Sequence, residues 1–243
     1  MRNKKTFIKK EDNVFGIFLS KNFLNEVKMG FLRKLLLYKK ICIQCHNNPD
    51  SDAIASAFGI YRYLQSKGIE AFIIYSGKQA FKKNAIKMMV RECKIPIQYV
   101  DNLPDCNLLL LVDCQYGQGN VTAFPFENIM MIDHHIKVVE NKEDYLIKSD
   151  YQSCSTIIYE LLLEEGYPVK EDKELSIALL YGLYIDTACF ADLYKSADKE
   201  MLSALFEEQP LFERLMKSSI IIKMVCSFLV MKKLIKKFLL FVQ

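Results

Sequence analysis

The sequence predicts an α/β protein with three layers, α/β/α, around a mostly parallel central sheet. Apolar, strand-like runs alternate with segments of helical period along most of the 243 residues. Several of the strand-like runs are continuously apolar, which is typical of strands covered on both faces. Near the N-terminal end, a strand, a helix and a strand follow one another, and this order implies a parallel pair joined by a right-handed crossover.

Each element follows from its local pattern and from the residues that bound it. The helix that begins near Asp52 is expected to end at Lys67, because Gly68 stands where a helix C′ glycine is common. Helices are predicted over residues 21–40, 52–67, 79–93, 153–165, 172–185 and 197–206. Strands are predicted over residues 41–45, 69–75, 95–100, 107–113 and 128–133.

The composition changes near residue 212. We expect residues 1–212 to form one domain with an N-terminal helix, and residues 213–243 to form an apolar, basic helical tail. The segment from Lys217 to Gln243 holds six lysines and no acidic residue, glycine or proline. Such a helix could lie on an acidic membrane surface. A linker or the truncated start of a second domain is the favoured interpretation, because apolar helix stripes more often pack in a core.

Charge and cysteine usage are those of an ordinary cytoplasmic protein. The formal net charge is only +4, which permits an acidic ligand but does not indicate a surface for long duplex nucleic acid. Eight cysteines are scattered along the chain, and we expect reduced core thiols. Cys42 and Cys45 have the spacing of a metal or redox pair, but in a strand their side chains point to opposite faces.

Polar side chains gather where strands and one apolar helix end. His46, Asp50 and Asp52 follow the first strand, and the remaining acids and histidines follow at the ends of later elements: Asp113, Asp133, His134, His135 and Asp186. In an open α/β sheet, ligands bind beyond the carboxyl ends of the strands. We therefore expect these groups to converge, although a single aspartate at such a position is more often a solvated loop residue, and Asp52 could simply cap its helix.

Convergence of these groups would require cations. Four carboxylates, from Asp50, Asp52, Asp113 and Asp186, repel one another when they lose water, and two divalent ions neutralise them. Oxygen and imidazole donors without a thiolate suit Mn²⁺, Mg²⁺ or Fe²⁺ better than a structural zinc ion. Two such ions form the usual arrangement for attack of a metal-activated hydroxide on phosphorus.

Four segments carry these residues in order: HNNPDSDAIAS from His46, LLLLVDCQYGQGNV from Leu108, MMIDHHIKVV from Met130 and YGLYIDTACF from Tyr181. They resemble the successive motifs of the DHH phosphoesterases over residues 20 to 210. That family includes RecJ-like exonucleases, oligoribonucleases that also act on 3′-phosphoadenosine 5′-phosphate, cyclic-dinucleotide phosphodiesterases and manganese-dependent pyrophosphatases.

The resemblance implies a role for each position. One ion would be held by His46, Asp50, Asp113 and Asp186, and the other by Asp52, Asp113, His134 and Asp186. Asp133 would orient a histidine, and His135 would face the substrate phosphate. Asp113, His134, His135 and Asp186 would therefore be the catalytic residues.

The resemblance implies a metal-dependent phosphoesterase that hydrolyses short oligonucleotides or small nucleotides. The oligomeric state is left open, and a homodimer is one alternative. Relatives that act on nucleotides carry a Gly-rich, His-containing motif in a second domain. This chain has no glycine after Gly182 and no histidine after His135, so we expect the substrate-binding half to be missing or replaced. A catalytically incomplete metal- and nucleotide-binding module is the alternative, and an inorganic pyrophosphatase is the second enzymatic candidate.

Overall fold

The structure, a computed structural model, describes residues 29–77, 84–206 and 210–218. Within these ranges it contains a six-stranded sheet. The strands are β1 (Lys40–Gln44), β2 (Glu70–Tyr75), β3 (Ile97–Tyr99), β4 (Leu108–Val112), β5 (Ile129–Asp133) and β6 (Tyr145–Ile147). The helices are α1 (Phe31–Leu35), α2 (Ser51–Ser66), α3 (Asn84–Glu92), α4 (Cys154–Glu164), α5 (Lys173–Asp186), α6 (Ser196–Leu205) and α7 (Pro210–Ser218).

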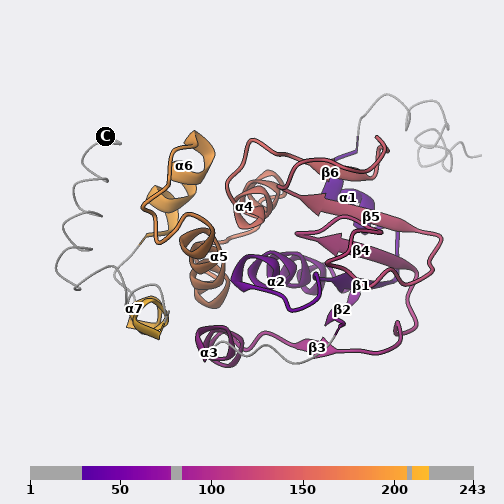
Figure 1. The fold of residues 1–243 in the computed structure, drawn as a ribbon, viewed down its shortest axis with the longest axis horizontal. Coiled ribbons are helices and arrows are strands. Elements are labelled where there is room, and N and C mark those ends of the chain that lie inside the picture. Colours follow the sequence, from indigo (N-terminus) through magenta and orange to yellow (C-terminus); the bar gives the residue numbers. More distant parts are fainter. Residues whose placement is uncertain (1–28, 78–83, 207–209, 219–243) are drawn as a thin grey trace, which may run out of the picture.

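The sheet confirms the predicted α/β class. Its strand order is β3-β2-β1-β4-β5-β6, and each neighbouring pair is parallel. The order reverses between β1 and β4, whose connections leave in opposite directions, and such a switch point is where α/β sheets bind ligands. In Figure 1, α2, α4 and α5 gather on one side of the sheet, with α6 and α7 outside them.

The two faces of the sheet have different cover. The larger core joins alternate strand residues to buried side chains of all seven described helices. The smaller core, around Leu109, Leu111 and Met131, is closed by Val121 and Phe124 from the β4–β5 connection. The crossovers on this second face are therefore loops within the described residues. Cys42 packs in the smaller core and Cys45 in the larger one, so the pair does point to opposite faces.

Some elements differ from the predicted ones. The predicted helix over residues 21–40 ends too late, because α1 stops at Leu35 and β1 already begins at Lys40. Residues before 29 lie outside the described ranges. The start of the helix predicted over 79–93 also lies outside them. Strand β6 was not predicted, because three half-buried residues give no readable alternation.

Helix α7 continues the larger core. It spans residues 210–218, and its residues Phe212, Leu215 and Met216 are buried. Residues 219–243 lie outside the described ranges, so the predicted tail stays a prediction. No helix among the described residues is long and apolar enough to cross a membrane.

Candidate metal centre

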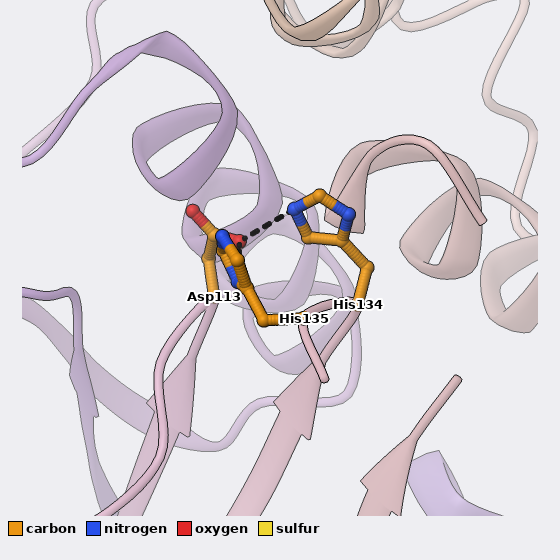
Figure 2. Close-up of side chains that lie close together, drawn as sticks. All are labelled: Asp113, His134 and His135. Atoms are coloured by element: carbon orange, nitrogen blue, oxygen red, sulfur yellow. Dashed lines mark ion pairs between the residues drawn. The ribbon is translucent and has the colours of Figure 1, made fainter. Parts of the chain in front are cut away.

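The predicted acids and histidines lie together at the carboxyl edge of the sheet, around the switch point between β1 and β4. His46 and Asp50 lie between β1 and α2, and Asp52 lies in the first turn of α2. Asp113 follows β4, and His134 follows β5. Figure 2 shows Asp113, His134 and His135 meeting above the ends of these two strands. Elements distant in sequence thus supply one cluster.

One group of potential ligands lies on the β1 side of the cluster. The Nε2 atom of His46 lies 3.7 Å from Oδ2 of Asp50 and 3.8 Å from Oδ2 of Asp113. These three residues offer ligand atoms that lie within 4.8 Å of one another. The spacing is suitable for a single cation among them.

A second group lies on the β5 side. The Nε2 atom of His134 lies 3.9 Å from Oδ2 of Asp52 and 3.6 Å from Oδ2 of Asp186. The same nitrogen lies 3.3 Å from Oδ1 of Asp113. Asp113 thus turns one carboxylate oxygen toward each group and stands between them. Asp186, at the end of α5, points inward and belongs to the second group of close ligand atoms.

Two buried atoms of the cluster lack a hydrogen-bond partner among the described residues. They are Oδ1 of Asp113 and Nε2 of His134. Leaving a buried acceptor and a buried ring nitrogen without partners is costly, unless another group satisfies them. A divalent cation would accept electron pairs from both, so the donor set fits a metal ion.

The electrostatics of the cluster also favour a cation. Burial, followed by the charges of Asp52 and Asp50, raises the pKa of Asp113 well above its usual value. The same causes raise the pKa of Asp186 to about 10. Burial opposes a charge on His46, but the hydrogen bond and charge of Asp50 outweigh it and raise its pKa to about 9. Without metal, the cluster therefore retains protons, which a metal would displace.

Two helix N-termini face the carboxylates. Asp50 is the N-cap of α2, and its Oδ1 accepts hydrogen bonds from the backbone N–H groups of Asp52 and Ala53 at 3.0 and 3.1 Å. Asp52 does not cap its own helix. It is fully buried, and its carboxylate accepts from the N–H groups of Cys154 and Ser155 at the start of α4, at 2.7 and 2.9 Å. Helix N-termini stabilise negative charge, so both acids are held in place.

Asp133 and a residue that the sequence did not indicate organise His135. Oδ1 of Asp133 accepts from Nδ1 of His135 at 2.8 Å, and Oδ2 accepts from Nε2 of Gln115 at 2.7 Å. Gln115 is buried and also binds the backbone of Ile136 and Val138. A glutamine three residues beyond a strand end gives no recognisable signal, so only the folded loop identifies it.

The fold and the site together define an α/β domain that gathers carboxylates and imidazoles at the switch point of a parallel sheet. The family model described as "DHH family, N-terminal domain" matches residues 40–184. The chain therefore belongs to the DHH family, as its four motifs indicated.

Several known proteins share this region. The chain is 27% identical over 174 residues to the cyclic-di-AMP phosphodiesterase GdpP of Geobacillus thermodenitrificans, covering 65% of this chain and 26% of that protein. It is 29% identical over 154 residues to a protein of Streptococcus thermophilus named probable manganese-dependent inorganic pyrophosphatase. This match covers 61% of this chain and 48% of that protein. The crystal structure of an exopolyphosphatase-related protein from Bacteroides fragilis shares the fold. It superimposes with a TM-score of 0.60 at 20% identity, covering 77% of this chain and 60% of that one.

The matched region is only part of each relative. It spans about a quarter of the phosphodiesterase and about half of the pyrophosphatase. The family model alone therefore assigns the chain to its family, and these relatives assign it no substrate.

Proposed function

We propose that this chain is a metal-dependent phosphoesterase that hydrolyses short oligonucleotides or small nucleotides. The observation that carries the proposal is the position of Asp113, whose two carboxylate oxygens face two separate ligand groups. Such a shared carboxylate is suitable for two neighbouring cations. Family membership supports hydrolysis of a phosphate ester or anhydride as the reaction class.

Two divalent ions would be held by residues that already lie together. His46, Asp50 and Asp113 would hold one, and Asp52, His134 and Asp186 would hold the other with Asp113. Mn²⁺ is the favoured ion, given oxygen and imidazole donors and a manganese-dependent relative. When bound, such ions lower the pKa of water and offset phosphate charge.

The protein's own groups would orient the substrate. The hydrogen bond to Asp133 raises the pKa of His135, although burial opposes a charge there. The imidazole is more than half exposed, because 58% of its side-chain surface is accessible. Asp133 holds the Nδ1 proton, so in the protonated ring Nε2 is left to donate a hydrogen bond to a phosphate oxygen.

Hydrolysis of defined substrates tests the proposal. The chain should be incubated with Mn²⁺ and, in parallel, with a dinucleotide, a generic phosphodiester and pyrophosphate. We expect release of mononucleotides from the dinucleotide, and no release by Asp113→Asn. Activity that Asp113→Asn retains in full would contradict the assignment to this site.

The same assay separates the two alternatives. Preferential cleavage of pyrophosphate would support the inorganic pyrophosphatase, which the named relative favours. Binding of Mn²⁺ and nucleotide in a calorimeter without product would instead support a catalytically incomplete binding module. The matched region spans only part of each relative, so a relative's activity cannot stand in for a measurement. The assay must therefore use this chain itself.

A further inference from the structure

Helix α6 contacts the segment behind the metal centre through a buried carboxylate. Asp198 lies in the first turn of α6 and is fully buried. It offers no ligand atom to any of the potential metal-binding groups among the described residues. A buried carboxylate is costly unless hydrogen bonds compensate it, so its partners indicate its role.

Both oxygens of Asp198 bind the segment that leads into α4. Oδ2 accepts from the backbone N–H of Gln152 at 3.0 Å, and Oδ1 accepts from Oγ1 of Thr156 at 2.5 Å. Between these two points, Ser153 caps α4 by accepting from the N–H of Thr156. Asp198 therefore holds both ends of the segment 152–156.

This segment supplies the hydrogen bonds that orient two potential ligands. The carbonyl oxygen of Tyr151 belongs to the same peptide unit as the Gln152 N–H that Asp198 binds. This oxygen lies 3.3 Å from Nδ1 of His134, and the contact leaves Nε2 facing the acids. The N–H groups of Cys154 and Ser155 fix the carboxylate of Asp52. A shift of the segment would thus move an imidazole and a carboxylate of the second group together.

The same segment also anchors the chain that follows Asp186. Oε1 of Gln152 accepts from the N–H groups of Tyr194 and Lys195 at 2.8 and 3.0 Å. Its Nε2 donates to the carbonyl of Asp192 at 2.5 Å. Asp52 and His134 are therefore bonded to this stretch directly, and the Gln152 side chain holds the chain that follows α5 beside it.

We propose that Asp198 is a positioning residue that sets the geometry of the metal site formed by Asp52, His134 and Asp186. A carboxylate accepts from both partners at once, the Gln152 N–H and the Thr156 hydroxyl. An amide at this position would accept from the Gln152 N–H and donate to the Thr156 oxygen, so the Thr156 hydroxyl would have to turn its proton toward Ser153. The inference rests on the metal binding proposed above.

Metal affinity tests the role directly. Binding of Mn²⁺ alone should be measured by calorimetry for the parent chain, Asp198→Asn and Thr156→Val, with thermal unfolding in EDTA alongside. Loss of an outer-shell partner commonly weakens metal binding about 10-fold to 100-fold. We expect Asp198→Asn to weaken Mn²⁺ binding within this range. Thr156→Val, which removes one donor, should weaken it less.

Asp172→Asn is the matched control. The Asp172 side chain is nearly as buried and accepts from Nε of Arg62 and the hydroxyl of Tyr167, both at 2.7 Å, at the opposite end of α5 from Asp186. This substitution should lower the melting temperature and leave Mn²⁺ affinity unchanged.

The outcomes separate the two claims. Equal Mn²⁺ affinity in the parent and in a folded Asp198→Asn variant would overturn the role of Asp198 and leave the proposed function standing. If Asp198→Asn does not fold, Thr156→Val decides the question by the same comparison. Absence of Mn²⁺ binding by the parent would instead overturn the metal site itself.

Discussion

At the scale of single residues, Asp113 combines a buried charge with an uncommon backbone conformation. It is 2% exposed, and its backbone φ of +60° lies in the left-handed region, which residues other than glycine, asparagine, aspartate and histidine rarely adopt. Its carboxylate also meets other acids. Such a costly arrangement at a sheet edge is expected where a residue serves a ligand rather than the fold.

Asp113→Asn separates these effects. Asparagine tolerates the left-handed backbone and fills the same volume, but it removes the buried charge. We expect the variant to melt in EDTA at the same temperature as the parent or higher, and to lose more than about 100-fold in Mn²⁺ affinity. Differential scanning fluorimetry with and without Mn²⁺ measures both. A normal Mn²⁺-induced rise in melting temperature would contradict the assignment.

The stability of the metal-free chain should fall as pH rises. Asp113 and Asp186 have raised pKa values, so the folded state keeps protons that the unfolded chain loses above about 3.8. His46 also keeps its proton up to about pH 9 in the folded state, against 6.5 when unfolded. The contributions of the two carboxyl groups therefore decline from about pH 5 to pH 9, and that of His46 declines from about pH 6.5 to pH 9.

Melting temperatures measured in EDTA and in Mn²⁺ across this pH range check the predicted fall in stability. The EDTA curve should decline, and the gain from Mn²⁺ should increase, because the metal displaces the same protons. The pKa values of Asp50 and Asp133 are lowered from 3.8, so these two groups change the stability only near and below pH 3.8. That is outside the range from about pH 5 to pH 9. A pH-independent gain from Mn²⁺ would contradict the prediction.

At the scale of elements, the packing of α2 against α5 sets the distance between Asp52 and Asp186. Gly182 on α5 faces α2 and α4 at very close range. A Cβ there would meet the Ser155 hydroxyl, and it would lie 2.9 Å from Oδ1 of Asp52 and 3.1 Å from the Asp52 backbone. A glycine is thus required for α5 to bring Asp186 into the cluster.

Gly182→Ala should therefore weaken both the fold and the site. Overpacking of a buried contact costs about 1–3 kcal/mol, and the backbone of α2 can move only by displacing Asp52. We expect a lower free energy of unfolding and weaker Mn²⁺ binding, measured by urea titration and calorimetry.

Gly59→Ala is the control for this prediction. Its added Cβ would meet the end of the Ile158 side chain at 2.6 Å, away from the acids. It should reduce stability and leave Mn²⁺ affinity intact. Equal loss of affinity in both variants would show that general destabilisation, rather than the α2–α5 contact, explains the effect.

At the scale of the whole molecule, α7 closes the larger core against α5. Phe212 is 2% exposed and lies edge-on to Tyr181 and Tyr184, with ring centroids 6.5 and 5.9 Å apart. Phe190, the last of three consecutive residues with left-handed backbone beyond Asp186, stacks on the ring of Phe212. The domain core therefore extends to the last described helix.

Phe212→Ala measures this closure. Truncation of a buried phenylalanine costs about 3–5 kcal/mol, so the free energy of unfolding should fall by that order. Leu163→Ala, on the exposed face of α4, should have little effect. Chemical denaturation of both variants checks the prediction, and an unchanged midpoint for Phe212→Ala would mean that α7 is not part of the cooperative unit.

The sequence by itself determined the order of the strands and helices other than β6 and α7, the parallel sheet and the acids and histidines at its carboxyl edge, because these follow from local hydrophobic pattern and from motifs. It could not decide whether Asp52 caps α2 or binds another element, because both readings fit the same local sequence. Only the tertiary structure placed Asp52 on the N-terminus of α4, Asp50 on the cap of α2, and Gln115 and Asp198 behind the cluster. These contacts join residues far apart in the chain, and burial and hydrogen-bond partners at such distances are set by packing rather than by local pattern.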